Sequence, residues 1–179
     1  GEHGAAEPFW LAEQATSGIT GMMLSLAIGG AAMMVCLLVQ GFLLFLATRY
    51  YVMHIAWVKS SSRAMTMLLI SRVMLMLVLG NLLQGGIWAL LFMSLGEFSD
   101  WDTAYYFSLV NFATLGYGDI VMSDRWRILG PIQAMNGVLM IGVSTASITA
   151  VVHDAFQRSW QKSNLAPKTT EQAQKNDQI

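Results

Sequence analysis

Three long stretches of the chain contain no charged residue: residues 14–48, 73–96 and 128–152. A helix needs about 20 mainly apolar residues to cross a bilayer, so each stretch is long enough. The helix-favouring residues Leu, Met and Ala continue past the first stretch, so this part of the chain predicts a helix over residues 18–58. A turn is predicted at residues 59–64. The other two predict helices over residues 65–96 and 128–155. The pattern therefore predicts three membrane crossings.

A shorter helical segment lies between the second and third stretches, at residues 100–113. Ser99 and Asp102 before and within it resemble a capping box, which begins a helix. Its helical run at residues 103–113 spans roughly 17 Å at about 1.5 Å per residue, too little to cross, so it must enter the membrane and turn back. Such a segment is tolerated at membrane depth only if it is buried in protein or lines water. The prediction is an all-α membrane protein with three transmembrane helices and one re-entrant helix.

The charges indicate the orientation of these crossings. No acidic residue lies between Glu13 and Glu97. The first connection instead holds or adjoins four basic residues, Arg49, Lys59, Arg63 and Arg72. Since cytoplasmic loops carry an excess of Lys and Arg, this connection is predicted to be cytoplasmic. Residues 1–17 are then an extracytoplasmic segment, residues 156–179 a cytoplasmic tail, and the N-terminus lies outside.

The composition excludes several classes of protein. Of the 179 residues 55% are hydrophobic and 12% are charged, about half of the roughly 25% typical of soluble domains. A net charge of -1 gives no general attraction to nucleic acid, so no such partner is expected. Cys36 is the only cysteine and is expected to be a small buried residue. Asn81 and Gln84 are expected to form hydrogen bonds between helices.

One short run directly follows the re-entrant helix: Thr114, Leu115, Gly116, Tyr117, Gly118 and Asp119. It resembles the filter of potassium channels, TVGYG, which is very often followed by Asp. Alternating left- and right-handed backbone aims successive carbonyl oxygens to one side, and glycine adopts the left-handed conformation cheaply. The resemblance implies that the carbonyls of Thr114 to Gly118 and the Thr114 hydroxyl coordinate K+, with the Tyr117 side chain bracing the strand from behind. A simple Gly-Tyr-Gly turn is the alternative.

More specifically, the chain is similar to small prokaryotic potassium channels with one extra N-terminal crossing. The resemblance implies a pore domain at residues 65–155 with four parts: outer helix 65–96, pore helix 100–113, filter 114–119 and inner helix 128–155. One filter supplies one side of the coordination cage, so a homotetramer in membrane lipid is implied, with residues 18–58 as a peripheral helix. The expected location is the plasma membrane, as a bacterial inner-membrane protein. K+ is then the permeant ion, and no cofactor or soluble partner is expected.

Three departures from the family pattern concern the filter and its support. Leu115 replaces the common Val. The pore-helix pair Tyr106 and Phe107 replaces Trp-Trp, so the indole donor that would reach Asp119 is absent and Asp119 is free to bond elsewhere. The resemblance still implies that Asp119, Tyr106 and Phe107 support the filter. Val110 stands where some members have a buried Glu. Ion selectivity remains the expectation, while the stability of the filter is left open.

Two glycines of the third crossing have two possible roles. In this family an inner-helix glycine often serves as a gating hinge, and Gly137 lies near the matching distance from the filter, with Gly142 as the alternative. Close helix packing would explain either glycine equally well.

The predicted function is passive, potassium-selective conduction. A weakly selective cation channel and a non-conducting accessory subunit with a vestigial filter are the alternatives. An enzyme is not expected, because the sequence contains no constellation of base, nucleophile and metal ligands.

Overall fold

The computed structural model describes residues 9–58 and 63–176, and over these ranges the protein is all-helical, without strands. It contains four helices, α1 (Phe9–Val58), α2 (Arg63–Ser94), α3 (Trp101–Phe112) and α4 (Leu129–Asn176). The predicted all-α class is confirmed. Helix α1 begins before the predicted residue 18, and α4 continues well past the predicted residue 155 into the expected tail. Parts of the predicted N-terminal segment, first turn and tail (residues 1–8, 59–62 and 177–179) lie outside the described residues.

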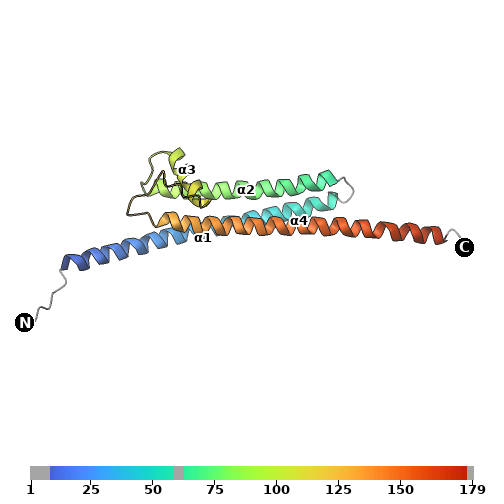
Figure 1. Ribbon diagram of the computed structural model, residues 1–179, viewed down its shortest axis with the longest axis horizontal. Helices are drawn as coiled ribbons and strands as arrows, with labels where there is room; N and C mark the ends of the chain where they lie inside the picture. Colours follow the sequence, from blue (N-terminus) through green and yellow to red (C-terminus); the bar gives the residue numbers. More distant parts are fainter. Residues whose placement is uncertain (1–8, 59–62, 177–179) are drawn as a thin grey trace, which may run out of the picture. The chain divides into compact units, whose positions relative to one another are not determined.

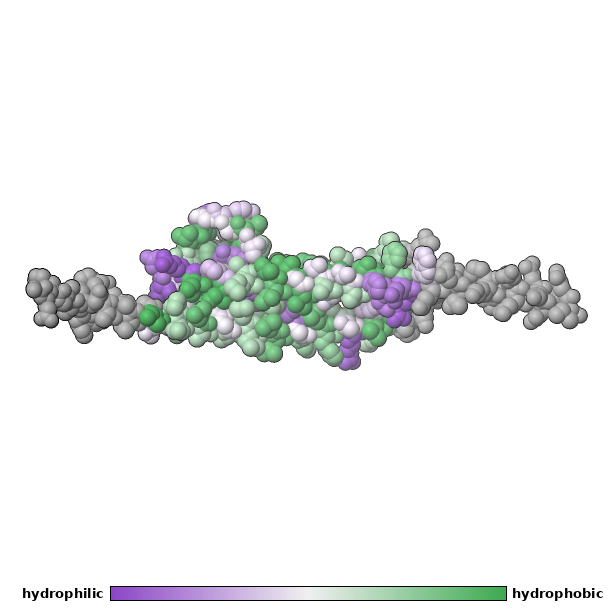
Figure 2. All heavy atoms as spheres, turned by 60° about the horizontal axis from the view of Figure 1, so that its bottom comes forward, coloured by the Kyte–Doolittle hydropathy of each residue, from purple (hydrophilic) through white to green (hydrophobic). Residues whose placement is uncertain are grey.

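Three of the helices are long and apolar enough to cross a membrane, over Ile19–Ile55, Ala64–Ser94 and Leu129–Arg158. These are the three crossings that the uncharged stretches predict. Many of their large apolar side chains are exposed on the surface of the single chain. Figure 2 shows a largely hydrophobic face with small groups of hydrophilic residues. In water so much exposed apolar surface would promote association, whereas lipid tails solvate it.

The described chain packs as two units, and α1, α2 and α4 each run through both. The first unit combines the chain up to Gly41 with Gly80–Ile141, and the second combines Phe42–Leu79 with the chain from Gly142 onward. Helix α3 and the loop after it belong to the first unit, where Figure 1 shows them beside the end of α2 and the start of α4.

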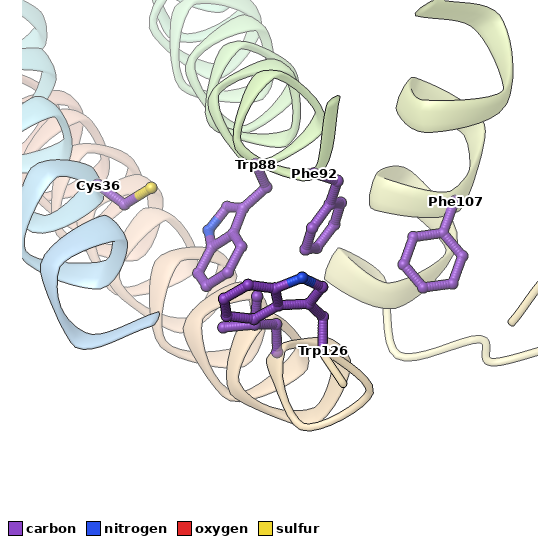
Figure 3. Packing of buried hydrophobic residues seen from close by; sticks show 6 residues of the cluster. Cys36, Trp88, Phe92, Phe107 and Trp126 are labelled. Carbon is purple, nitrogen blue, oxygen red and sulfur yellow. The ribbon is translucent and has the colours of Figure 1, made fainter. Parts of the chain in front are cut away.

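An aromatic cluster forms the core of the first unit (Figure 3). Trp88 and Phe92, one turn apart on α2, lie with ring centroids 5.8 Å apart. Phe107 of α3 meets Phe92 edge to face, with centroids 5.5 Å apart. Trp126 joins the cluster from the loop before α4, and Cys36 joins it from α1. The cluster therefore attaches α3 to α2 and confirms that Cys36 is buried.

A buried amide pair joins α1 to α2 in the same unit. Gln84 Nε2 donates to Gln40 Oε1 over 2.7 Å. Interhelical hydrogen bonds of this kind contribute on average about 0.6 kcal/mol in a membrane protein. The interhelical bond predicted for Gln84 is confirmed.

In the second unit, α1 contacts both other helices through adjacent tyrosines. The Tyr51 hydroxyl donates to Asp154 Oδ2 of α4 over 2.8 Å, and Arg158 Nε donates to the same oxygen over 2.7 Å. The Tyr50 hydroxyl accepts a hydrogen bond from Arg72 of α2 over 3.2 Å. The arginines and the carboxylate are therefore partnered within the unit, which lowers the cost of placing them on apolar helices.

Candidate functional site

Helix α3 begins with a side-chain cap. Asp100 has an extended backbone, and its carboxylate accepts a hydrogen bond from the Thr103 backbone N–H over 2.8 Å. Hydrogen bonds from the Thr103 side chain and backbone lower the pKa of Asp100. The expected cap, Ser99, is therefore wrong by one residue. Both Asp100 and Asp102 of the first turn place negative charge at the positive end of the helix dipole.

The loop after α3 stays attached to the end of the helix. The Thr114 N–H donates to the Asn111 carbonyl and the Leu115 N–H donates to the Val110 carbonyl, both over 2.9 Å. These bonds satisfy two carbonyls that a helix C-terminus otherwise leaves unpaired. The position of the loop is therefore coupled to the position of α3.

Every second residue from Thr114 to Gly118 has a left-handed backbone. The φ angles are 58° at Thr114, 53° at Gly116 and 76° at Gly118. The two glycines take this conformation without strain, as their role in the sequence predicts. Thr114 was not expected to take it, and a left-handed conformation costs a non-glycine residue roughly 1–2 kcal/mol. The backbone therefore alternates between left-handed and right-handed conformations from Thr114 to Gly118.

Two large side chains of the loop are open to the surroundings of the single chain. Leu115 is 55% exposed and Tyr117 is 65% exposed, although both are large. Tyr117 was expected to brace the strand from behind, but its own chain leaves most of its ring uncovered. Any cover for these two side chains must therefore come from outside the chain.

Tyr106 connects α3 to the far end of the loop. Its hydroxyl donates to Asp119 Oδ2 over 2.8 Å. This hydrogen bond and the removal of water raise the pKa of Tyr106. The phenol of Tyr106 therefore replaces the missing indole donor as a partner of Asp119. Phe107, the other member of the pair, is buried in the aromatic cluster and does not take part.

A carboxylate outside the predicted set joins the two connections that flank α3. Just after the end of α2, Gly96 has a φ of 77°, and the hydrogen bond from the Glu97 N–H to the Phe92 carbonyl completes a Schellman motif. The Glu97 carboxylate then accepts hydrogen bonds from the Ser123 backbone N–H over 2.8 Å and from the Ser123 hydroxyl over 2.5 Å. Sequence patterns contain no signal for this pair, since its members lie far apart along the chain.

The two glycines of α4 differ in their surroundings. A Cβ on Gly137 would overlap the Phe112 carbonyl oxygen at the end of α3, so α4 approaches α3 there backbone to backbone. A Cβ on Gly142 would meet nothing within 4 Å. Close packing therefore explains Gly137, whereas a hinge at either glycine stays a prediction.

The arrangement suits binding of a partly dehydrated cation more than bond-breaking chemistry. It offers successive backbone carbonyls and one hydroxyl, at Thr114, on a loop with alternating backbone hand. Among the described residues there is no cluster of three or more His, Cys, Asp or Glu side chains that could hold a metal ion.

Comparison with known proteins identifies one family. A family model described as an ion channel matches residues 33–154, which is more than half of the chain and includes α3 and the loop after it. No curated protein and no solved structure matches the chain.

Replacing Tyr106 by Phe should loosen the loop without disturbing α3. The variant keeps the ring and loses only the donor to Asp119, so amide hydrogen exchange around Gly118 and Asp119 should become several-fold faster. Tyr105→Phe is the matched control, because the Tyr105 hydroxyl donates to the Leu82 carbonyl of α2 and not to the loop. Since the pKa of Tyr106 is raised, the contribution of the bond should persist at neutral pH and be lost only as alkaline pH ionises the phenol. Equal exchange in both variants would contradict this role.

Gly137→Ala should be far more damaging than Gly142→Ala. An overpacked site costs roughly 1–3 kcal/mol, and a collision with backbone should fall at the upper end. At Gly142 the added methyl meets nothing and should raise helix stability by up to about 1 kcal/mol. The measurement is the thermal unfolding midpoint of each purified protein in detergent. Similar midpoints for the two variants would rule out the close approach at Gly137.

Proposed function

The chain belongs to the ion channel family, and from this premise we propose that it is a potassium-selective channel that conducts K+ passively through a homotetrameric pore. The observation that carries the proposal is the run from Thr114 to Asp119, with left-handed backbone at Thr114, Gly116 and Gly118. Residues of this kind, with this alternation, allow successive carbonyls to face one side. Conduction involves no bond making or breaking, so no enzymatic activity is proposed.

In this proposal the filter coordinates K+ with main-chain oxygens. The ligands are the carbonyls of Thr114, Leu115, Gly116, Tyr117 and Gly118, together with the Thr114 hydroxyl. They replace the hydration shell of the ion, so K+ is a permeant ion and not a resident cofactor. The C-terminal, negative end of α3 adds a favourable field for a cation in the water-filled cavity below. Asp119 and Tyr106 hold the outer end of the filter.

Four chains are proposed because one filter cannot enclose an ion. Rings of four carbonyls need four strands around one axis. The exposure of Leu115 and Tyr117 supports such an assembly, since neighbouring subunits would cover apolar side chains that their own chain leaves open. The surrounding partner is membrane lipid, in the plasma membrane and specifically a bacterial inner membrane.

Ion flux from liposomes that contain only the purified chain tests the proposal. We expect K+ flux well above Na+ flux, and we expect Gly116→Ala to abolish this preference because a Cβ is strained at a φ of 53°. Gly30→Ala is the matched control, since its Cβ would lie within α1 and meet nothing within 4 Å. Equal K+ and Na+ flux would favour a weakly selective channel. Absence of any flux would favour a non-conducting accessory subunit.

The proposed orientation places the N-terminus outside and the connection between α1 and α2 in the cytoplasm. The basic residues near that connection support it, with no acidic residue between Glu13 and Glu97. Each single cysteine is introduced into the Cys36→Ala variant and labelled in intact cells with a membrane-impermeant thiol reagent. Ser61→Cys should resist the reagent, whereas Ala5→Cys should react. The reverse labelling pattern would refute the orientation.

A further inference from the structure

One serine of α3 is hydrogen-bonded to both neighbouring helices. The Ser108 hydroxyl donates to the Gly85 carbonyl of α2 over 2.6 Å. Gln133 of α4 donates from Nε2 to the Ser108 carbonyl over 3.0 Å and to the Ser108 hydroxyl over 2.5 Å. Ser108 and Gln133 are fully buried. Buried polar contacts of this kind specify one arrangement of the helices, because any other would leave polar groups unpaired.

The orientation of the Gln133 amide follows from its partners. A carbonyl only accepts hydrogen bonds, so Nε2 and not Oε1 must face the Ser108 carbonyl. The Ser108 hydroxyl uses its single hydrogen toward Gly85, so it too accepts from Nε2. The Gln133 Oε1 atom has no hydrogen-bond partner among the described residues. The side chain thus gives both of its N–H groups to one residue of α3 while its own acceptor goes unpaired.

Two contacts that lie one turn apart join α3 to α4. Gln133 and Gly137 lie one turn apart on α4, and they meet Ser108 and Phe112, which lie one turn apart on α3. At Gly137 the backbones of α3 and α4 touch, so this residue sets the distance between the two helices. It has no side chain that could donate a hydrogen bond. Gln133 supplies the directional contact of the pair.

The end of α3 transmits its position to the loop. Val110 and Asn111, which follow Ser108 in the helix, accept hydrogen bonds from Leu115 and Thr114. A tilt of α3 at Ser108 would therefore move the first residues of the filter. We propose that Gln133 is a positioning residue for the filter, which acts through Ser108. This inference rests on the proposed function in so far as the filter conducts ions.

Gln133→Met tests the proposal because it keeps the length of the side chain and removes its donors. Gln84→Met is the matched control: Gln84 is also a fully buried glutamine in the first unit, but it donates to α1 and not to α3. In the tetramer, amide exchange at Thr114 and Leu115 should accelerate at least on the order of tenfold in Gln133→Met, because two buried hydrogen bonds are lost. In liposomes the preference for K+ over Na+ should fall. Gln84→Met should lower the unfolding midpoint and leave both of these properties unchanged.

The two measurements separate failure of this inference from failure of the proposed function. If the parent chain conducts no ions, the proposed function fails, but amide exchange still tests the role of Gln133. If exchange at Thr114 and Leu115 is unchanged in Gln133→Met, or rises equally in Gln84→Met, the positioning role is refuted. If Gln133→Met does not fold, Gln133→Leu takes its place. It also removes both N–H groups that Gln133 donates to Ser108, and unchanged exchange in this variant would refute the role equally.

Discussion

Between two helices that are long and apolar enough to cross a membrane, the chain leaves the helical hydrogen-bond pattern at Thr114. Non-helical backbone at membrane depth must be buried in protein or line water, because lipid offers no hydrogen-bond partners. A short helix directly before the loop reduces the problem, since carbonyls at the end of α3 accept from the first two amides of the loop. The remaining carbonyls need water or an ion, which is the property that the proposed channel uses.

Because the loop depends on α3, much of the first unit serves to hold that helix. Contacts of different physical kinds share this task. Asp100 caps its start, Phe107 attaches it to the aromatic cluster, and Ser108 joins it to both neighbours. Gly137 allows α4 to approach its last turn. In lipid, apolar burial does not drive helices together as it does in water, so close packing and polar contacts carry a larger share of the specificity.

The support of the proposed filter shows that a hydrogen-bond donor can be kept while the residue type changes. The resemblance to the family left the partner of Asp119 open, because the indole donor is absent. Tyr106 nevertheless reaches the carboxylate with its hydroxyl. Residue type alone therefore did not decide the contact, since any donor of suitable reach at that position can make it. The same reasoning explains why the Ser99 cap was misplaced, as Asp100 beside it offers an equally good acceptor.

Local patterns were sufficient for the three long apolar helices, the short helix and the left-handed backbone of Gly116 and Gly118, because absence of charge, helix length and backbone freedom are properties of neighbouring residues. They could not indicate which partner each polar group would find. Ser108 and Gln133, Tyr106 and Asp119, and Glu97 and Ser123 are each more than ten residues apart, and their contacts exist only once α2, α3 and α4 are packed. The left-handed backbone of Thr114 likewise depends on the packed structure and not on the local sequence. A threonine has no intrinsic preference for it, so contacts made by the rest of the unit must impose it.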